Sequence, residues 1–333
     1  MLRSALVAPE LPIPLSEVES AFNLPGDLEM VAFHRGIGGA WQVRSPTGGQ
    51  WSLKVLPFPA PTYQIETLQT AGRLEGLALA AGVDIVPPVE PPRPTAGLAT
   101  RIDAHLVWMH RWMDQIPQGE RLPIDTWLGQ TAARLHALWP IGCDHEASLA
   151  HAYGIHDQAD WRDWLDQGDR LALPWVQHVR GIMPAIAEAT ALATAALSLP
   201  NVPRCMSHRD LNPPNILHTP DGPLLCDFGS SGCEAPWFEI VDASLSFDQA
   251  GPGMLEAYRR AGGQTGPTTS EALARHTSET LGFLAFIMWL SLGHRERTQV
   301  QRDEATAWIP ELVHTLSTQV ESLEQNRRIL FGR

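Results

Sequence analysis

Residues Ser207–Leu217 read Ser-His-Arg-Asp-Leu-Asn-Pro-Pro-Asn-Ile-Leu, and Leu225–Gly229 read Leu-Cys-Asp-Phe-Gly. Asp210 precedes Asn215 by five residues and Asp227 by seventeen. The Pro-Asp-Gly sequence between the two motifs favours a hairpin turn, because glycine tolerates a positive φ. The expected strands on either side of that turn are residues 215–217 and 224–226.

The residue types in these motifs suit phosphoryl transfer, which needs an oriented acceptor hydroxyl and neutralised phosphate charge. Asp210 is predicted to contact the acceptor and take its proton, and His208 to brace the loop. Asn215 and Asp227 are predicted to bind Mg²⁺, which prefers oxygen ligands. His-Arg-Asp-Leu-x-x-x-Asn and Asp-Phe-Gly are kinase signatures, and their joint occurrence in order is a stronger signal than either alone.

Lys54 is the only lysine among the 24 basic residues of the chain, and it lies in the strand-like run Trp51–Leu56. A compact ammonium at a close phosphate contact is not replaceable by a guanidinium. Lys54 is therefore predicted to hold nucleotide phosphates. A helix expected over residues 64–81 should supply its acidic partner, either Glu66 or Glu75. At about 100° per residue these two acids lie on opposite faces, and the apolar neighbours of Glu75 favour it.

A glycine turn and a hinge complete the predicted nucleotide site. The turn glycines, which would let backbone N–H groups approach phosphates, are Gly36, Gly38 and Gly39. Trp41 stands where G-x-G-x-x-G would have its third glycine. The hinge is predicted near residues 110–114, with Arg111 and Trp112, where backbone groups would meet an adenine edge.

The chain after residue 125 is predicted to be mainly helical, from its apolar spacing. The expected helices are residues 126–139, 160–169, 175–197, 268–292 and 306–329. His136 is predicted to pack in the first of them. The acids and tryptophans of residues 160–169 favour a solvated helix, and the alternative is an acceptor-binding wall with Asp163 and Trp164. Glu234 is a third candidate acceptor contact.

The net charge and the amino-acid composition indicate which kinds of partner the protein can bind. A net charge of −13 over 333 residues argues against nucleic acid and is compatible with a cationic ligand. Four cysteines without C-x-x-C spacing indicate a reduced, cytoplasmic protein. The N-terminus has no adequate signal-peptide core, and the apolar run Leu281–Leu292 is too short to span a bilayer. No membrane partner is expected, and the oligomeric state stays open.

From about residue 33 to 242 the chain resembles the aminoglycoside phosphotransferase and choline kinase-like branch of the protein-kinase fold. The resemblance implies an α+β, bilobal architecture, with a small antiparallel-sheet N-lobe (1–110) and a larger, mainly helical C-lobe (111–333). It implies ATP or GTP as donor, Mg²⁺ as cofactor, and a small-molecule hydroxyl as acceptor.

The resemblance also assigns roles to residues. It implies that Lys54 and its glutamate position the phosphates, that Asp210 is the base, and that Asn215 and Asp227 bind magnesium. Arg209 departs from the family pattern, in which a small residue is usual. It is expected to pair with one of three acids, namely Glu234, Glu239 and Asp242.

The expected acceptor is an aminoglycoside or another antibiotic, in resistance, self-protection or biosynthesis. A metabolite such as choline, homoserine or a sugar is the alternative. A protein kinase is disfavoured because Ala235-Pro236 follows Asp227 by only eight residues, which is too short for an activation segment. A non-catalytic nucleotide-binding protein is disfavoured because every catalytic position is filled.

Overall fold

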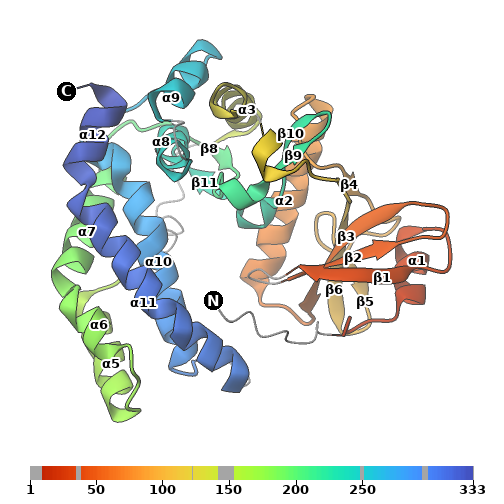
Figure 1. Ribbon diagram of the computed structural model, residues 1–333, viewed down its shortest axis with the longest axis horizontal. Helices are drawn as coiled ribbons and strands as arrows, with labels where there is room; N and C mark the ends of the chain where they lie inside the picture. Colours follow the sequence, from red (N-terminus) through yellow and green to blue (C-terminus); the bar gives the residue numbers. More distant parts are fainter. Residues whose placement is uncertain are drawn as a thin grey trace. The chain divides into compact units, whose positions relative to one another are not determined.

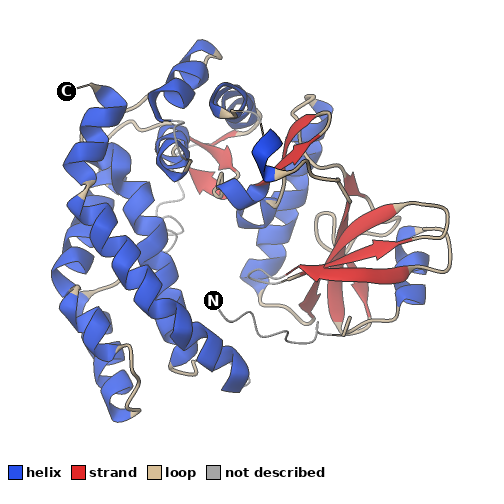
Figure 2. Cartoon of the chain, viewed as in Figure 1, coloured by secondary structure: helices blue, strands red, loops and turns tan. Residues whose placement is uncertain are grey.

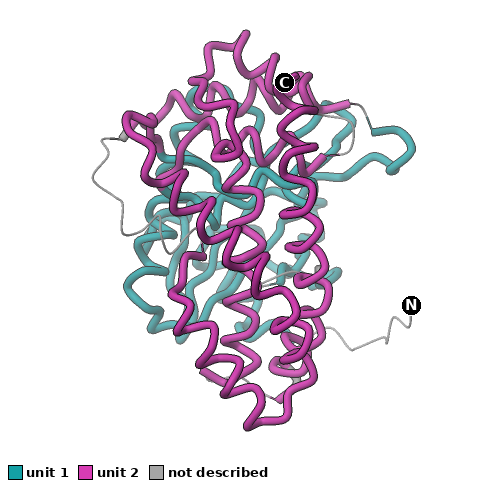
Figure 3. The backbone as a smooth tube through the Cα atoms, turned by 90° about the vertical axis from the view of Figure 1, so that its left-hand side faces the viewer, with its two compact units in different colours: residues 1–122, 206–232 teal, residues 123–205, 233–333 magenta. Residues whose placement is uncertain are grey.

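The computed structural model of the protein describes residues 10–34, 39–121, 123–141, 154–247, 251–294 and 299–332. The chain divides into two compact units, drawn in different colours in Figure 3. The first contains residues 1–122 and 206–232, and the second contains residues 123–205 and 233–333. Strands dominate the first unit and helices the second (Figure 2), which confirms the predicted α+β class. The units differ from the predicted lobes, 1–110 and 111–333, because the loop with the catalytic motifs joins the sheet-containing unit.

The first unit is built on an antiparallel sheet with the strand order β1-β2-β3-β6-β4, and β5 pairs with β6 (Figure 1). The strands are β1 (Glu29–His34), β2 (Ala40–Arg44), β3 (Gln50–Pro57), β4 (Pro88–Val89), β5 (Thr100–Ile102) and β6 (His105–Arg111). Strands β1 and β2, on either side of the predicted glycine turn, pair antiparallel, and β5 and β6 form a second antiparallel pair.

The two faces of this sheet have different neighbours because side chains alternate along each strand. On one face Leu53, Val55 and Met109 form a buried cluster with Val18 and Phe22 of α1 (Leu15–Phe22). The other face carries the alternate residues of the same strands. There, Leu106 of β6 packs against Leu68 of α2 (Thr62–Ala80), the helix predicted over residues 64–81.

The predicted hairpin is confirmed as β9 (Ile216–Thr219) and β10 (Gly222–Leu225), an antiparallel pair. Short 3₁₀ turns precede and follow it, at Pro213–Asn215 and Phe228–Ser230. Backbone hydrogen bonds fix it to the rest of the first unit. The Val86 N–H donates to the Leu225 carbonyl at 2.9 Å, and the Leu225 N–H donates to the Asp84 carbonyl at 2.9 Å.

The second unit is mainly helical. Its helices are α3 (Asp125–Ala137), α5 (Gln158–Arg170), α6 (Val176–Gly181), α7 (Met183–Leu197), α8 (Pro236–Ser246), α9 (Gly251–Arg260), α10 (Ala274–Ser291), α11 (Gln299–Glu321) and α12 (Leu323–Phe331). A three-stranded sheet has the order β11-β8-β7, from β7 (Pro140–Ile141), β8 (Arg204–Ser207) and β11 (Gly232–Glu234). Helices α8 and α9 were not predicted.

Two predicted long helices are each divided in two. The expected helix 175–197 is interrupted between α6 and α7, where Pro184 stands in the first turn of α7 and lacks the N–H that a continuous helix needs. The expected helix 306–329 is likewise split between α11 and α12 at Ser322. The apolar run Leu281–Leu292 lies largely in α10, whose Leu281, Leu284 and Met288 are buried. Within the described ranges, none of the helices has the length and apolar character to cross a membrane.

Candidate active site

Each of the two motif turns holds a non-glycine residue in the left-handed region of backbone space. Arg209 has φ 65° and Asp227 has φ 64°. Such conformations cost on the order of 1–3 kcal/mol each and cluster at functional sites. The φ of Arg209 explains why a small residue suits this position. The Arg209 side chain also lies against Gly232, where a Cβ would come within 2.6 Å of the guanidinium.

Lys54 of β3 and Asp227 form an ion pair, with 2.6 Å between Nζ and Oδ1. Burial raises the pKa of Asp227, but the charge and hydrogen bond of Lys54 and the backbone N–H of Gly229 outweigh that effect. The pKa of Asp227 is therefore held below its ordinary value. The two side chains stay 25% and 39% exposed, so a ligand can reach both.

The Asp210 loop is held by two asparagines. Asn215 Nδ2 donates to the Asp210 carbonyl at 2.9 Å, and Asn212 Nδ2 donates to Asp210 Oδ1 at 2.6 Å. The Asn215 carbonyl accepts from the Cys226 N–H at 2.9 Å, which places Asp227 beside the Asn215 turn. Asn212 was not predicted, although its position two residues after Asp210 is a usable signal.

His208 has the bracing role that the sequence predicts. Its side chain is fully buried, and its Nε2–H donates to the Cys226 carbonyl at 2.9 Å. Its ring meets Phe228 edge-on, with 4.6 Å between the ring centroids. These contacts fasten the Asp210 loop to the Asp227 turn.

The donor set at this loop fits the predicted magnesium ion. Asp227 offers carboxylate oxygens, and Asn215 offers Oδ1 because its amide nitrogen is committed to Asp210. Mg²⁺ usually takes one or two protein oxygens and fills its shell with water and substrate phosphates. The side chains present therefore suit Mg²⁺ with a nucleotide.

The expected ion pair between Lys54 and a helix acid is absent from the described residues. Glu75 of α2 is 4% exposed and bonds to His110 of β6, with 2.8 Å between Oε1 and Nε2. Glu66 is exposed. His110 was not predicted as the partner of Glu75, because the sequence pattern pointed to Lys54.

The hinge and glycine turn differ in part from expectation. The Arg111 N–H donates to the Pro87 carbonyl at 2.9 Å, and the Trp112 N–H donates to the Gln50 carbonyl at 3.0 Å. These two amides are therefore engaged within the sheet and not offered to an adenine edge. Gly39 has φ 59°, and a Cβ there would lie 2.4 Å from the Phe33 ring, so this position requires glycine. Gly36 and Gly38 lie outside the described residues.

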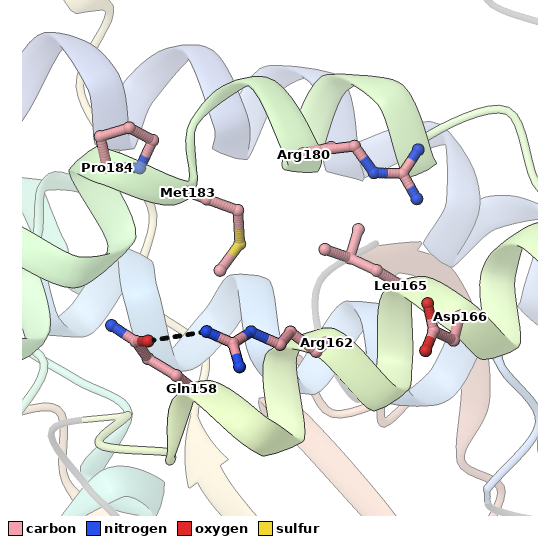
Figure 4. A pocket seen from close by; sticks show the side chains of 7 residues that line it. All are labelled: Gln158, Arg162, Leu165, Asp166, Arg180, Met183 and Pro184. Atoms are coloured by element: carbon pink, nitrogen blue, oxygen red, sulfur yellow. Dashed lines mark hydrogen bonds between the residues drawn. The ribbon is translucent and has the colours of Figure 1, made fainter.

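The candidate acceptor residues on α5, Asp163 and Trp164, contact other side chains of the same helix. Asp163 is exposed and accepts a hydrogen bond from Gln167 at 2.7 Å, and the Trp164 ring lies 5.2 Å from that of Trp161. Neither lines the pocket of about 440 Å³ beside α5 (Figure 4). The lining residues are Gln158, Arg162, Leu165, Asp166, Arg180, Met183 and Pro184. The charged groups at this pocket are of both signs, because Asp166 lines it beside Arg162 and Arg180, and Arg180 is paired with Asp169.

Glu234 is fully buried, and its Oε2 accepts from Arg275 Nη1 at 2.7 Å. We therefore leave Glu234 out of the acceptor site. The other two acids considered for Arg209 are also buried with partners of the second unit. Glu239 bonds to His136 Nε2 at 2.7 Å, and Asp242 bonds to His276 Nδ1 at 2.9 Å.

The model of the phosphotransferase enzyme family matches residues 40–275, a range that includes Lys54, Asp210, Asn215 and Asp227. The chain belongs to this family and is a phosphotransferase. No curated protein sequence matches it.

Solved structures with the same fold include three at low identity. A spectinomycin phosphotransferase in complex with ADP and spectinomycin has a TM-score of 0.62 at 11% identity, covering 93% of this chain and 99% of that one. A choline/ethanolamine kinase family protein from Mesorhizobium loti has a TM-score of 0.53 at 16% identity, covering 93% and 98%. An aminoglycoside phosphotransferase from Alicyclobacillus acidocaldarius has 0.52 at 16%, covering 98% and 99%. The predicted kinase-like fold is confirmed.

Proposed function

We propose that the protein transfers the γ-phosphoryl group of ATP to a hydroxyl of a small molecule. The observation that carries this is the 2.6 Å contact between Lys54 and Asp227, which joins two predicted nucleotide-site residues from distant parts of the sequence. The Asp210 loop is fastened to the same turn through His208 and Asn215.

Each side chain has a task in this proposal. Lys54 holds the phosphates, and Asp227 and Asn215 hold Mg²⁺, which when bound neutralises charge on the phosphates. Asp210 orients the acceptor hydroxyl and takes its proton. Asn212 fixes the Asp210 carboxylate through Oδ1. Positioning and charge neutralisation are most of what phosphoryl transfer asks of a protein.

An aminoglycoside or another antibiotic with a hydroxyl is the acceptor we propose, with a role in resistance, self-protection or biosynthesis. The spectinomycin complex supports an antibiotic, and its ADP supports an adenine nucleotide. The choline/ethanolamine kinase relative supports the alternative of a small amino alcohol. The net charge of −13 is compatible with either cationic acceptor.

The test is acceptor-dependent ADP release by the purified protein, with Mg·ATP and panels of hydroxylated antibiotics and of amino alcohols. We expect release with at least one compound and none without it. Asp227→Ala should abolish Mg²⁺-dependent ATP binding in calorimetry, because it removes the carboxylate from the metal. Unchanged Mg·ATP affinity in this variant would refute the assignment of Asp227.

A further inference from the structure

A tryptophan stands directly opposite the single lysine of the chain. Strands β3 and β6 pair antiparallel, with Lys54 opposite Trp108 and Leu56 opposite Leu106. Directly opposite residues point to the same face of a sheet, with their Cβ atoms about 4.5–5.5 Å apart. The aliphatic stem of Lys54 therefore lies beside the indole of Trp108.

The indole of Trp108 is packed where α2 covers this face of the sheet. It lies against a buried cluster that includes Leu68 of α2, Ala99 and Leu106. A tryptophan side chain has few torsions, so close packing leaves it little freedom. Trp108 therefore offers the lysine stem a rigid surface.

Trp108 also borders the turn that carries the partner of Lys54. It lines a small cavity of about 20 Å³ together with Asp227, Phe228 and Gly229. That volume has room for about one water molecule. Trp108 is thus a neighbour of both members of the ion pair, whose Nζ and Oδ1 atoms are 2.6 Å apart.

The Lys54 ammonium benefits from a rigid neighbour because its stem is flexible. The side chain is 25% exposed, and each torsion of such a stem has three staggered wells. Exposed ion pairs are weak partly because holding a long side chain in one geometry costs entropy. A fixed ring beside the stem removes part of that freedom before a ligand binds, which is preorganisation.

We propose that Trp108 is a positioning residue of the nucleotide site. Its indole restricts the stem of Lys54, so that the ammonium stays at Asp227, where the phosphates would bind. The proposal rests on the proposed function for the identity of the ligand alone, since the restriction of Lys54 exists without a nucleotide.

The experiment measures how fast the single lysine is acylated. The protein without nucleotide is treated with N-hydroxysuccinimide acetate, and mass spectrometry follows the peptide that contains Lys54. An ammonium held at a carboxylate is a poor nucleophile, so Lys54 should react slowly in the wild type. Trp108→Leu should raise the rate about three- to tenfold, because one or two freed torsions each add about three conformations. The Kd for Mg·ATP, measured by calorimetry, should weaken by a similar factor.

Three further variants separate positioning from packing. Trp108→Phe keeps a flat ring beside the stem and should stay within about twofold of wild type in both measurements. Leu106→Ala is the matched control, because it removes packing from the same cluster and strand but lies opposite Leu56 and not Lys54. Trp108→Met keeps an apolar side chain in the cluster and replaces Trp108→Leu if that variant does not fold.

The labelling rates decide the proposal. A purely structural role for Trp108 predicts that Leu106→Ala raises the rate at Lys54 as much as Trp108→Leu does. That result, or an unchanged rate in Trp108→Leu, would overturn the proposal. Mg·ATP should slow the labelling of Lys54 in the wild type. If it does not, the assignment of Lys54 to the phosphates fails, whereas labelling of the Trp108 variants without nucleotide still decides the restriction, so the two failures are distinguishable.

Discussion

Two ion pairs, one in each unit of the molecule, differ in how far solvent reaches them. In the first unit Lys54 and Asp227 are 25% and 39% exposed. In the second unit Glu234 and Arg275 are 0% and 5% exposed. A partly exposed pair can exchange its partner for a ligand, whereas a sealed pair is held because a lone buried charge is costly.

Other buried polar contacts join helices of the second unit. Together with the Glu234–Arg275 pair and Asp242 we call them the sealed network. His136 of α3 bonds to Glu239 of α8 at 2.7 Å and to the Tyr258 hydroxyl of α9 at 2.9 Å. Burial raises the pKa of Tyr258, with a further contribution from Cys205. Such a network specifies how helices pack, so its members should matter for folding and those of the first unit for turnover.

The largest expected effect is on chemistry alone. Asp210→Asn keeps the size of the side chain but removes the base, so kcat should fall on the order of a thousandfold. Mg·ATP affinity and thermal stability should stay near wild type, because the role proposed for Asp210 is at the acceptor hydroxyl and not at the nucleotide. Steady-state kinetics with an identified acceptor gives the measurement. Near-normal turnover would exclude Asp210 as the base.

The second-largest expected effect is a loss of stability when a buried ion pair of the sealed network is broken. Glu234→Gln removes the carboxylate that accepts from Arg275 Nη1 and leaves Asp242, 3.7 Å from Arg275 Nε, as its acidic neighbour. The loss of unfolding free energy should therefore lie at the lower end of the about 3–5 kcal/mol expected for a broken buried pair. Glu324→Gln is the control, because Glu324 is bonded to Arg327 and Arg328 on the surface, where solvent screens the charges and the pair contributes little to stability. Urea unfolding of both variants measures the difference. Equal stability would show that the two kinds of pair do not differ as proposed.

The sequence predicted the first unit better than the second for a physical reason. The Asp210 loop and Asp227 turn combine strained backbone with fixed chemistry, which limits the residues that fit and leaves a readable motif. The His136–Glu239 network depends on which helices pack together, and residue spacing along one helix does not contain that information. Glu234 illustrates the limit, since a carboxylate predicted at the acceptor is fully buried.

The next prediction asks whether the partly exposed Lys54–Asp227 pair requires an ammonium group. Lys54→Arg keeps the charge, but the planar guanidinium is wider and fixed in its fork geometry. Displacing the phosphates by about 1 Å should lower turnover about a hundredfold, nearly as much as Lys54→Ala. Steady-state kinetics of Lys54→Arg and Lys54→Ala with an identified acceptor measures both losses of turnover. Turnover in Lys54→Arg above about a third of wild type would make Lys54 an ordinary strand residue.

The smallest expected effect is on the pH dependence of stability, and it comes from Asp242 of the sealed network. Burial raises the pKa of Asp242, but His276 and Arg275 outweigh it and hold the pKa below the ordinary 3.8. As the pH falls, the unfolded chain therefore takes up a proton at this carboxyl before the folded protein does. The stability that Asp242 contributes is present above its unfolded pKa and is lost as the pH falls toward the folded pKa.

The variant Asp242→Asn cannot take up a proton at this position in either state. Its unfolding free energy, measured in urea at pH 7, 5 and 3.5, should be lower than that of the wild type at pH 7 but should fall less steeply with acid. Parallel pH profiles for the two proteins would mean that Asp242 titrates alike in both states, and that its contacts with His276 and Arg275 do not favour the charged form.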